Sequence, residues 1–337
     1  MHKLYEEIEC LPEELDDEYE YYEVDEDAAR ISLCTLGSIN WGAFRNPEDM
    51  RRACRILHRS LNNILDYQDF LSIQSKLSND EIRPLGVGIT NLAYWHAKRG
   101  LKYGDADALQ EVKTWMEHQA FYLTEMSVEL AEERGKCLGS DQTRYGQGVF
   151  PWELRAAGVN ELADFTAELP WEPLRERMIV SGVRNATVTA IAPVESSSVV
   201  INSTNGAEQP MSLITVKESK AGSLIQVVPE YNRLKTKYQL MWEQTDCVGY
   251  LKTSAVLAAY VDQSISTNTF YNPAHFADRK VPATLIAKNL MLAHYWGLKT
   301  MYYSLINKQG SKGVDAEETK LEVIDYDDEE SCEACKL

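Results

Sequence analysis

The sequence predicts an α/β fold, because strand-like apolar stretches alternate with stretches of helical periodicity along most of the chain. NATVTAIAP at 185–193 is rich in Thr, Val, Ala and Ile, the composition of a buried strand. A long helical pattern runs from Asp107 to Glu133 and precedes Gly135, a residue typical of helix C-termini. The chain has 337 residues, of which 44% are hydrophobic, so it can bury a sizeable core.

The first third of the chain predicts a strand and then helices. ISLCTLGSINW at 31–41 is a short apolar run compatible with a strand. A helix follows, in which Asn46 can act as the N-cap and Pro47 fits the first turn. Residues 83–100 predict a glycine-rich turn and a buried helix. LGVG at 85–88 lacks the third glycine of a dinucleotide-binding loop, and we interpret it as a tight turn.

Helices and strands also alternate in the rest of the chain. A helix around 171–181 ends at Gly182 and leads into the buried strand at 185–193. The further elements predicted are strands at 212–217, 223–229 and 298–306, and helices at 231–243, 249–266 and 284–297.

Both ends of the chain are acidic. Residues 1–30 hold 13 Asp or Glu and show no strong apolar period. From Lys308 onward the sequence is polar and acidic, which predicts a flexible tail. We therefore expect an acidic segment at 1–30, a main domain at 31–307 and a tail at 308–337.

Charge and cysteine content exclude several classes of protein. The net charge of −18 argues against a broad surface for nucleic acid or anionic membranes. The N-terminal residues lack the apolar core of a signal peptide, and no uninterrupted apolar run is long enough for a membrane span. Seven cysteines, an odd number without regular spacing, favour a reducing compartment. We expect a cytoplasmic protein.

Two cysteines, Cys332 and Cys335, form a C-x-x-C pair in the acidic tail. That spacing occurs in redox pairs and in half of a metal site, but no second pair lies nearby to complete four metal ligands, so we expect no metal. The alternatives are terminal cysteines without a function, or a flexible dithiol that carries electrons between a buried site and an external reductant.

An electron-carrying tail needs a buried disulfide as its partner. Cys34 is the natural candidate because it lies in the apolar run at 31–41. The alternative is an ordinary core cysteine, which is the commoner fate of such a residue.

The stretch APVESSSVVINSTNG at 192–206 follows the predicted buried strand. Pro193, Glu195 and the serines after it are typical of a helix N-terminus. Backbone N–H groups and hydroxyls at such a position can bind an anion, whereas the alternative is an ordinary serine-rich cap.

Tyr302 and Tyr303 are adjacent in a strand-like run. Tyrosines are common in strands, so packing alone can explain them. The alternative is a radical relay, because a phenol can lose an electron and a proton together.

Taken together, these stretches resemble the C-terminal half of the large (alpha) subunit of class I ribonucleotide reductase, in its class Ia form. WEPLRERMIVSGVRNATVTAIAP at 171–193 is the most specific match. The other matching stretches, in the expected order, are ISLCTLGSIN, LDYQDF, NSTNG, QVVPEY, DQSIS and KTMYY. The resemblance covers roughly residues 31–337.

The resemblance implies that 31–307 is the second half of a ten-stranded α/β barrel, made of two parallel five-stranded halves with a finger loop through the centre. The implied reaction replaces the 2′-hydroxyl of a ribonucleoside diphosphate with hydrogen. A thiyl radical removes the 3′-hydrogen, a glutamate handles the 3′-hydroxyl proton, and two cysteines supply electrons as they become a disulfide.

The resemblance also implies residue roles. By position, Cys34 resembles one of the two reducing cysteines, and Cys332 and Cys335 resemble the shuttle thiols. Tyr302 and Tyr303 resemble the stacked tyrosines of the radical relay. The positions that resemble the substrate diphosphate site are Pro193, Glu195, Ser196 and Ser197, with Val194 in place of a family serine.

The finger loop is only partly matched. LYEEI at 4–8 resembles its end, with Glu7 in the place of the catalytic glutamate. Lys3 and Tyr5 occupy the places of the motif's Asn and Cys. Cys10 lies nearby, but Pro12 occupies the place where a motif built on it would need its glutamate, so Cys10 is a weak candidate for the radical cysteine.

The resemblance implies several partners. They are a polypeptide with the first half-barrel and regulatory sites, a small (beta) subunit with a diiron-tyrosyl radical centre, glutaredoxin or thioredoxin, and the nucleotide substrate. No cofactor is expected on this chain itself. We expect a subunit gene split within the finger loop, an arrangement that favours a phage origin, and hence the host cytoplasm.

Two other functions remain open. The degenerate finger loop favours a catalytically inactive, reductase-like binding or regulatory partner. A stand-alone thiol oxidoreductase using the tail pair is disfavoured, because no active-site helix surrounds that pair.

Overall fold

The computed structural model describes residues 29–219, 222–308 and 322–325. Glu7, Cys10 and the tail cysteines Cys332 and Cys335 lie outside these ranges, as does almost all of the segment 1–30.

The centre of the fold is a parallel arrangement of five strands or extended segments. Strand β1 (Thr35–Asn40) pairs with β2 (Leu85–Thr90), and a parallel bridge joins Val87 of β2 to Thr189. A second parallel bridge joins Ile191 to Ile265. The segment that contains Ile265 continues into β5, which pairs in parallel with β6. The bounds of these last two strands are β5 Thr269–Tyr271 and β6 Ser304–Ile306.

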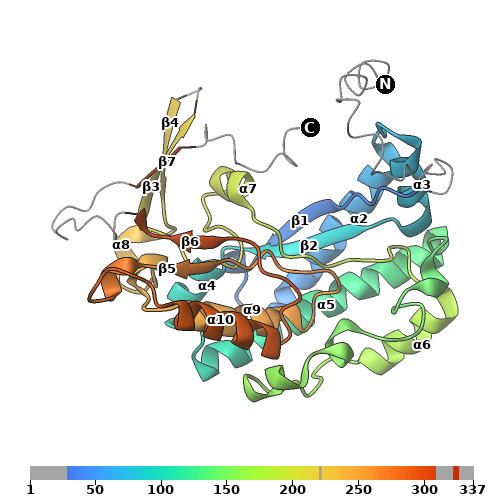
Figure 1. Ribbon diagram of the computed structural model, residues 1–337. Helices are drawn as coiled ribbons and strands as arrows, with labels where there is room; N and C mark the ends of the chain where they lie inside the picture. Colours follow the sequence, from blue (N-terminus) through green and yellow to red (C-terminus); the bar gives the residue numbers. More distant parts are fainter. Residues whose placement is uncertain (1–28, 220–221, 309–321, 326–337) are drawn as a thin grey trace, which may run out of the picture.

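Helices connect these strands. Figure 1 shows α2, α5, α9 and α10 along one side of the parallel strands, whereas α7 lies on the other side. The α-helices are α2 Arg51–Tyr67, α3 Ile73–Ile82, α4 Leu92–Arg99, α5 Ala106–Arg134, α6 Trp171–Ser181, α7 Glu195–Val200, α8 Tyr231–Leu234, α9 Val248–Ala258 and α10 Ala283–Tyr295. Short 3-10 turns cover Trp41–Ala43, Pro47–Met50, Ser140–Gln142, Pro151–Leu154, Ala157–Glu161, Met241–Glu243 and Pro273–His275. No helix among the described residues is long and apolar enough to cross a membrane.

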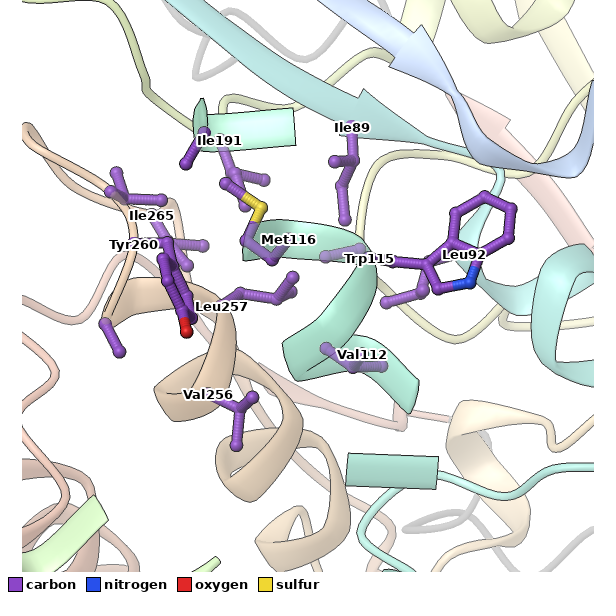
Figure 2. Packing of buried hydrophobic residues seen from close by; sticks show 14 of the residues in the cluster. Ile89, Leu92, Val112, Trp115, Met116, Ile191, Val256, Leu257, Tyr260 and Ile265 are labelled. Carbon is purple, nitrogen blue, oxygen red and sulfur yellow. The ribbon is translucent and has the colours of Figure 1, made fainter. Parts of the chain in front are cut away.

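The core lies between the parallel strands and the helices α5 and α9. Ile89, Ile191 and Ile265 come from three neighbouring strands and lie close to Met116 of α5 and Leu257 of α9 (Figure 2). All five side chains are buried. Burying an apolar side chain of this size contributes about 1.5–3 kcal/mol, so this layer fixes the strands on the helices.

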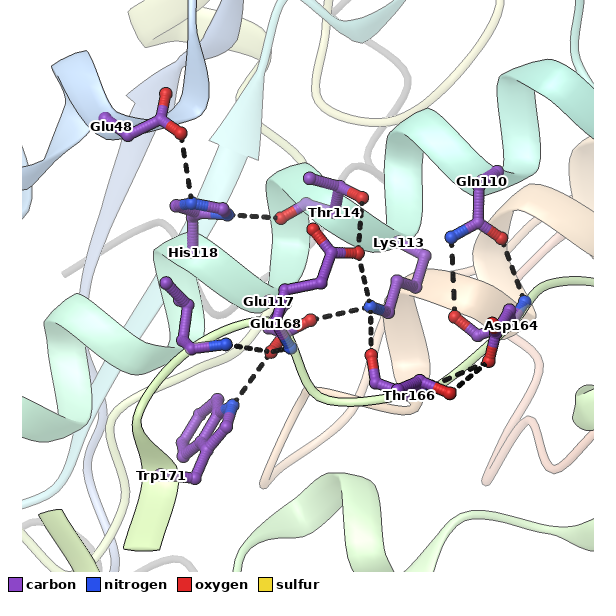
Figure 3. Close-up of polar contacts among 11 residues, drawn as sticks. Glu48, Gln110, Lys113, Thr114, Glu117, His118, Asp164, Thr166, Glu168 and Trp171 are labelled. Atoms are coloured by element: carbon purple, nitrogen blue, oxygen red, sulfur yellow. Dashed lines mark hydrogen bonds and ion pairs between the residues drawn. The ribbon is translucent and has the colours of Figure 1, made fainter. Parts of the chain in front are cut away.

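A buried ion pair fastens the loop before α6 to α5 (Figure 3). Lys113 and Glu117 have fully buried side chains, and the Lys113 Nζ lies 2.7 Å from the Glu117 carboxylate. Lys113 also donates to the carbonyl of Thr166 and to Glu168. Glu117 accepts from the Trp171 indole N–H at 3.0 Å. Because every charge here has partners, the loop is held in one conformation.

The interpretation of LGVG at 85–88 as a tight turn is wrong, because these residues belong to the fully buried strand β2. The glycines allow the backbones of adjacent strands to approach closely. A Cβ at Gly88 would lie 2.6 Å from the carbonyl oxygen of Ala190, and one at Gly86 would lie 2.8 Å from the Cys34 sulfur.

Other element boundaries also differ from expectation. The predicted helix at 249–266 ends at Ala258, because residues beyond it bond to a neighbouring strand: Ser266 N–H donates to the carbonyl of Ile191. The region 231–243 contains only α8 and a short 3-10 turn, and the Met241 N–H donates to Pro210 instead of to a helical neighbour. Helix α3 and strand β5 were not predicted.

A second, smaller sheet carries part of the predicted tail. Strand β3 (Ile214–Ser219) pairs antiparallel with β4 (Gly222–Val227), and both lie where the sequence predicts strands. Strand β7 (Glu322–Asp325) pairs in parallel with β3. Four residues of the predicted tail thus pair their backbone with a sheet edge. The rest of the tail lies outside the described residues.

Candidate active site

Cys34 immediately precedes β1, and its side chain is exposed. The expectation of a buried thiol is wrong for this chain. The reason is that β1 has only β2 as a strand partner among the described residues, so one edge of β1 is open. Cys34 is therefore not an ordinary core cysteine. The protein atoms packed around the sulfur are the main cause that raises the pKa of its thiol.

Gln263, which the sequence interpretation gave no role, holds the Cys34 thiol. The Cys34 Sγ donates to the Gln263 Oε1 at 3.5 Å. The amide nitrogen of Gln263 donates to the carbonyls of Leu85 at 2.8 Å and Thr189 at 3.3 Å. The only sequence signal for this residue is its place in the DQSIS stretch.

The predicted anion-binding segment does begin a helix. Helix α7 follows the strand segment that ends near Ile191, and its first helical bond runs from Ser198 N–H to the carbonyl of Val194 at 2.8 Å. The N–H groups of a first helical turn have no intrahelical partners and can bind an anion. The predicted phosphate-binding residues, whose side chains are exposed, are Pro193, Glu195, Ser196 and Ser197.

The NSTNG stretch fixes the start of α7. The Asn205 Oδ1 accepts the backbone N–H of Val194 at 2.8 Å. Thr204 is bonded to the carboxyl end of β2, because its carbonyl accepts from the Thr90 hydroxyl and its N–H donates to the Asn91 side chain, each at 3.0 Å. The loop is thus tied to the parallel strands, which makes Asn205 a positioning residue for α7.

The rings of Tyr302 and Tyr303 are in contact. Their centroids lie 4.1 Å apart and the planes are tilted by 50°, so the pair is not parallel-stacked. The backbone at this point joins the parallel strands: Tyr302 N–H donates to Thr267 and Tyr303 N–H donates to the Asn268 side chain, both at 2.9 Å. These backbone bonds therefore hold both tyrosines in the segment just before β6, and each side chain is partly exposed.

One cavity of about 320 Å³ joins Tyr303 to the start of α7. Glu195 and Tyr303 both line it, so the structure brings together two residues that the sequence places 108 positions apart (303 − 195). Glu208, also in its wall, accepts from the Asn268 amide. Burial raises the pKa of Glu208 to about 7. Glu208 and Asn268 were missed because only the tertiary structure brings them to Tyr303.

The structure does not bring all candidates together. Cys34 is not among the residues that line the cavity of Glu195 and Tyr303. Glu7, Cys10, Cys332 and Cys335 lie outside the described residues. Within the described ranges, no cluster of three or more His, Cys, Asp or Glu could hold a metal ion.

Comparisons with known proteins agree with this architecture. The family described as "Ribonucleotide reductase, barrel domain" matches residues 18–304. The ribonucleoside-diphosphate reductase subunit alpha of Haemophilus influenzae is 38% identical over 280 residues, 83% of this chain and 37% of that protein. The corresponding subunit 1 alpha of Escherichia coli is 37% identical over 275 residues, 81% of this chain and 35% of that protein. The subunit alpha of phage T4 is 34% identical over 313 residues, 92% of this chain and 40% of that protein. The chain thus spans two fifths or less of the length of these three relatives.

Proposed function

Because the chain belongs to the ribonucleotide reductase barrel-domain family, we propose that it acts as the C-terminal half of a class I ribonucleoside-diphosphate reductase large subunit. The reaction replaces the 2′-hydroxyl of a ribonucleoside diphosphate with hydrogen by a thiyl-radical mechanism and supplies DNA precursors. The N-terminal half of the large subunit, with the first half-barrel and the regulatory sites, completes the enzyme.

The observation that carries the proposal is the cavity shared by Glu195 and Tyr303. It supports a substrate diphosphate at the start of α7 near the end of a radical relay. Ser196 and Ser197 supply hydroxyls there, and Pro193 sets the turn. Ring contact at 4.1 Å between Tyr302 and Tyr303 supports transfer of an electron between the two phenols.

The thiol chemistry uses Cys34 and the tail. Cys34 is one of two cysteines that reduce the substrate and become a disulfide, and the second lies in the first half-barrel. Cys332 and Cys335 then reduce that disulfide by thiol exchange and are themselves reduced by glutaredoxin or thioredoxin. Tethering raises the local concentration of this dithiol at the site. In this proposal Glu7 handles the 3′-hydroxyl proton.

The remaining partner supplies the radical. A small (beta) subunit with a diiron-tyrosyl centre fits the tyrosine relay, and this chain needs no metal of its own. Open strand edges support docking of the first half-barrel: Leu36 of β1 and Ile306 of β6 are 50% and 52% exposed. Parallel strands are rarely left open in this way. We place the complex in the cytoplasm.

The test is reconstitution. The chain is co-expressed with the polypeptide that carries the first half-barrel, purified as a complex and assayed with the small subunit for reduction of ribonucleoside diphosphates. We expect deoxyribonucleoside diphosphates from the complex and none from either polypeptide alone. A stable complex that makes no product with an active small subunit would contradict the proposal.

One observation favours a second function. Lys3 and Tyr5 stand where the family's finger loop has Asn and Cys, and Val194 stands where a phosphate-binding serine is usual. An inactive reductase-like binding or regulatory partner would keep the fold and lose these groups. That function predicts that the chain binds the large-subunit polypeptide without any nucleotide reduction. This outcome would contradict the proposed enzymatic activity.

A further inference from the structure

We propose that Gln263 is a positioning residue for the Cys34 thiol, because its side-chain oxygen accepts the S–H group and holds it protonated in one orientation. The inference deepens the proposed function and rests on it only for its catalytic meaning. The contact itself can be measured without any turnover.

The orientation of the Gln263 amide is fixed by two strands. Its nitrogen donates to the Leu85 carbonyl of β2 and to the Thr189 carbonyl of the next strand. A flipped amide would turn its oxygen toward these two carbonyl oxygens and lose both hydrogen bonds. The oxygen is therefore the atom that faces Cys34.

An amide oxygen can only accept, so it stabilises the protonated thiol and opposes a thiolate. Two charged groups, Asp262 and Lys299, lie near this contact. The carboxylate of Asp262 disfavours a negative sulfur. Lys299 is directed elsewhere, because its Nζ donates to the backbone carbonyls of Asp262 and Gln263.

Gly86 leaves the space that this contact needs. A Cβ at Gly86 would lie 2.8 Å from the Cys34 sulfur, closer than such contacts are found. The thiol thus lies over the Cα of Gly86 in β2 and bonds to a side chain that bridges β2 and the strand segment of Thr189. Four separate parts of the chain contribute to this arrangement, at residues 34, 85–86, 189 and 263, and no local sequence pattern requires it.

A protonated thiol suits the proposed reaction. Two thiols become one disulfide and release two electrons and two protons. The 2′-hydroxyl leaves as water with one proton, and a hydrogen takes its place at carbon. A thiolate at Cys34 would lack the hydrogen that this balance requires from it.

The test measures the alkylation of Cys34 by iodoacetamide against pH in the full chain, with the Cys34 peptide quantified by mass spectrometry. Gln263→Met keeps the side-chain length and removes the acceptor. Loss of a hydrogen bond to the neutral form should lower the thiol pKa, and we expect alkylation at pH 7.5 to be about three- to tenfold faster.

Gln119→Met is the matched control, because Gln119 also bridges a buried donor and a β2 carbonyl: its amide accepts from Trp41 and donates to Gly88. It does not bond to Cys34, so its loss should leave the alkylation profile unchanged. Gln263→Asn, whose oxygen is one methylene too short, provides a second variant if Gln263→Met does not fold, and should also alkylate faster.

An unchanged or slower rate in folded Gln263 variants would overturn the proposal, as would an equal acceleration in Gln119→Met. In the reconstituted complex, Gln263→Met should also lower product formation with dithiothreitol as reductant. If the wild-type complex makes no product, the proposed function fails, while the alkylation profile still decides the role of Gln263.

Discussion

At the residue scale, the two tyrosines differ from ordinary strand residues in how they contact each other. Tyr302 and Tyr303 are consecutive, and side chains of consecutive strand residues normally point to opposite faces. Here the ring centroids lie 4.1 Å apart, because the pair precedes the regular part of β6. The backbone of Tyr303 bonds to the Asn268 side chain, which fixes this irregular point.

Replacing either tyrosine should separate the chemistry from the packing. Tyr303→Phe keeps the ring in the cavity wall and removes the oxidisable O–H. Tyr302→Phe keeps the neighbouring ring and removes its O–H. We expect both variants to assemble normally and to reduce nucleotides at background rates in the reconstituted complex. Co-purification yield is the control for assembly. Turnover close to wild type in either variant would contradict the relay.

His96 illustrates how a buried residue couples stability to pH. Burial lowers the pKa of His96 to about 3 from its usual 6.5, and the nearby Arg99 acts in the same direction. The unfolded chain binds a proton below pH 6.5 but the folded chain does not, so stability should fall as the pH drops from 6.5 toward 3.

His96→Phe should remove this dependence, because Phe keeps the packing against Trp95 and Tyr103 and cannot titrate. Between pH 7 and pH 5 we expect the wild type to lose about 2 kcal/mol more than the variant in free energy of unfolding. Urea denaturation at the two pH values measures the difference. Equal losses in both proteins would show that His96 is not the source.

At the scale of elements, helices were more predictable than strands. Helix α6 (Trp171–Ser181) matches its prediction, because helical periodicity and the glycine after it are local signals. Strand β2 was missed because its glycines suit close packing against Cys34 and Ala190, contacts that do not exist within the segment itself. In the site, the resemblance suggests Cys34 and Glu195 as candidates, whereas the contact of Gln263 with Cys34 joins residues 229 positions apart.

Helix α5 supplies a prediction at this scale, because its buried ion pair holds the loop before α6. Lys113→Met should leave the Glu117 carboxylate buried without its cation and cost about 3–5 kcal/mol. Lys113→Met combined with Glu117→Gln should recover part of that loss, because a glutamine oxygen can still accept from the Trp171 indole. Urea midpoints of the wild type, both single variants and the double variant give the coupling. A double variant less stable than Lys113→Met would contradict the account.

At the scale of the whole molecule, access to the proposed disulfide at Cys34 determines which reductants can reduce it. Cys34 lies at the open edge of the parallel strands, so docking of the first half-barrel there would enclose it. A bulky reductase cannot reach a disulfide in such a place, whereas a tethered dithiol or a small molecule can. Thiol exchange requires a thiolate to approach a disulfide sulfur closely.

The last prediction follows from that difference in access. Cys34→Ser should stop multiple-turnover reduction with any reductant, because a thiol that reduces the substrate is gone. Cys332→Ser or Cys335→Ser should stop it only when glutaredoxin or thioredoxin supplies the electrons, and dithiothreitol should partly restore activity. The measurement is deoxyribonucleoside diphosphate formed per complex with each reductant, with assembly checked by co-purification. If dithiothreitol fails to rescue the assembled tail variants, or rescues Cys34→Ser as well, then the shuttle and active-site thiols have been assigned wrongly.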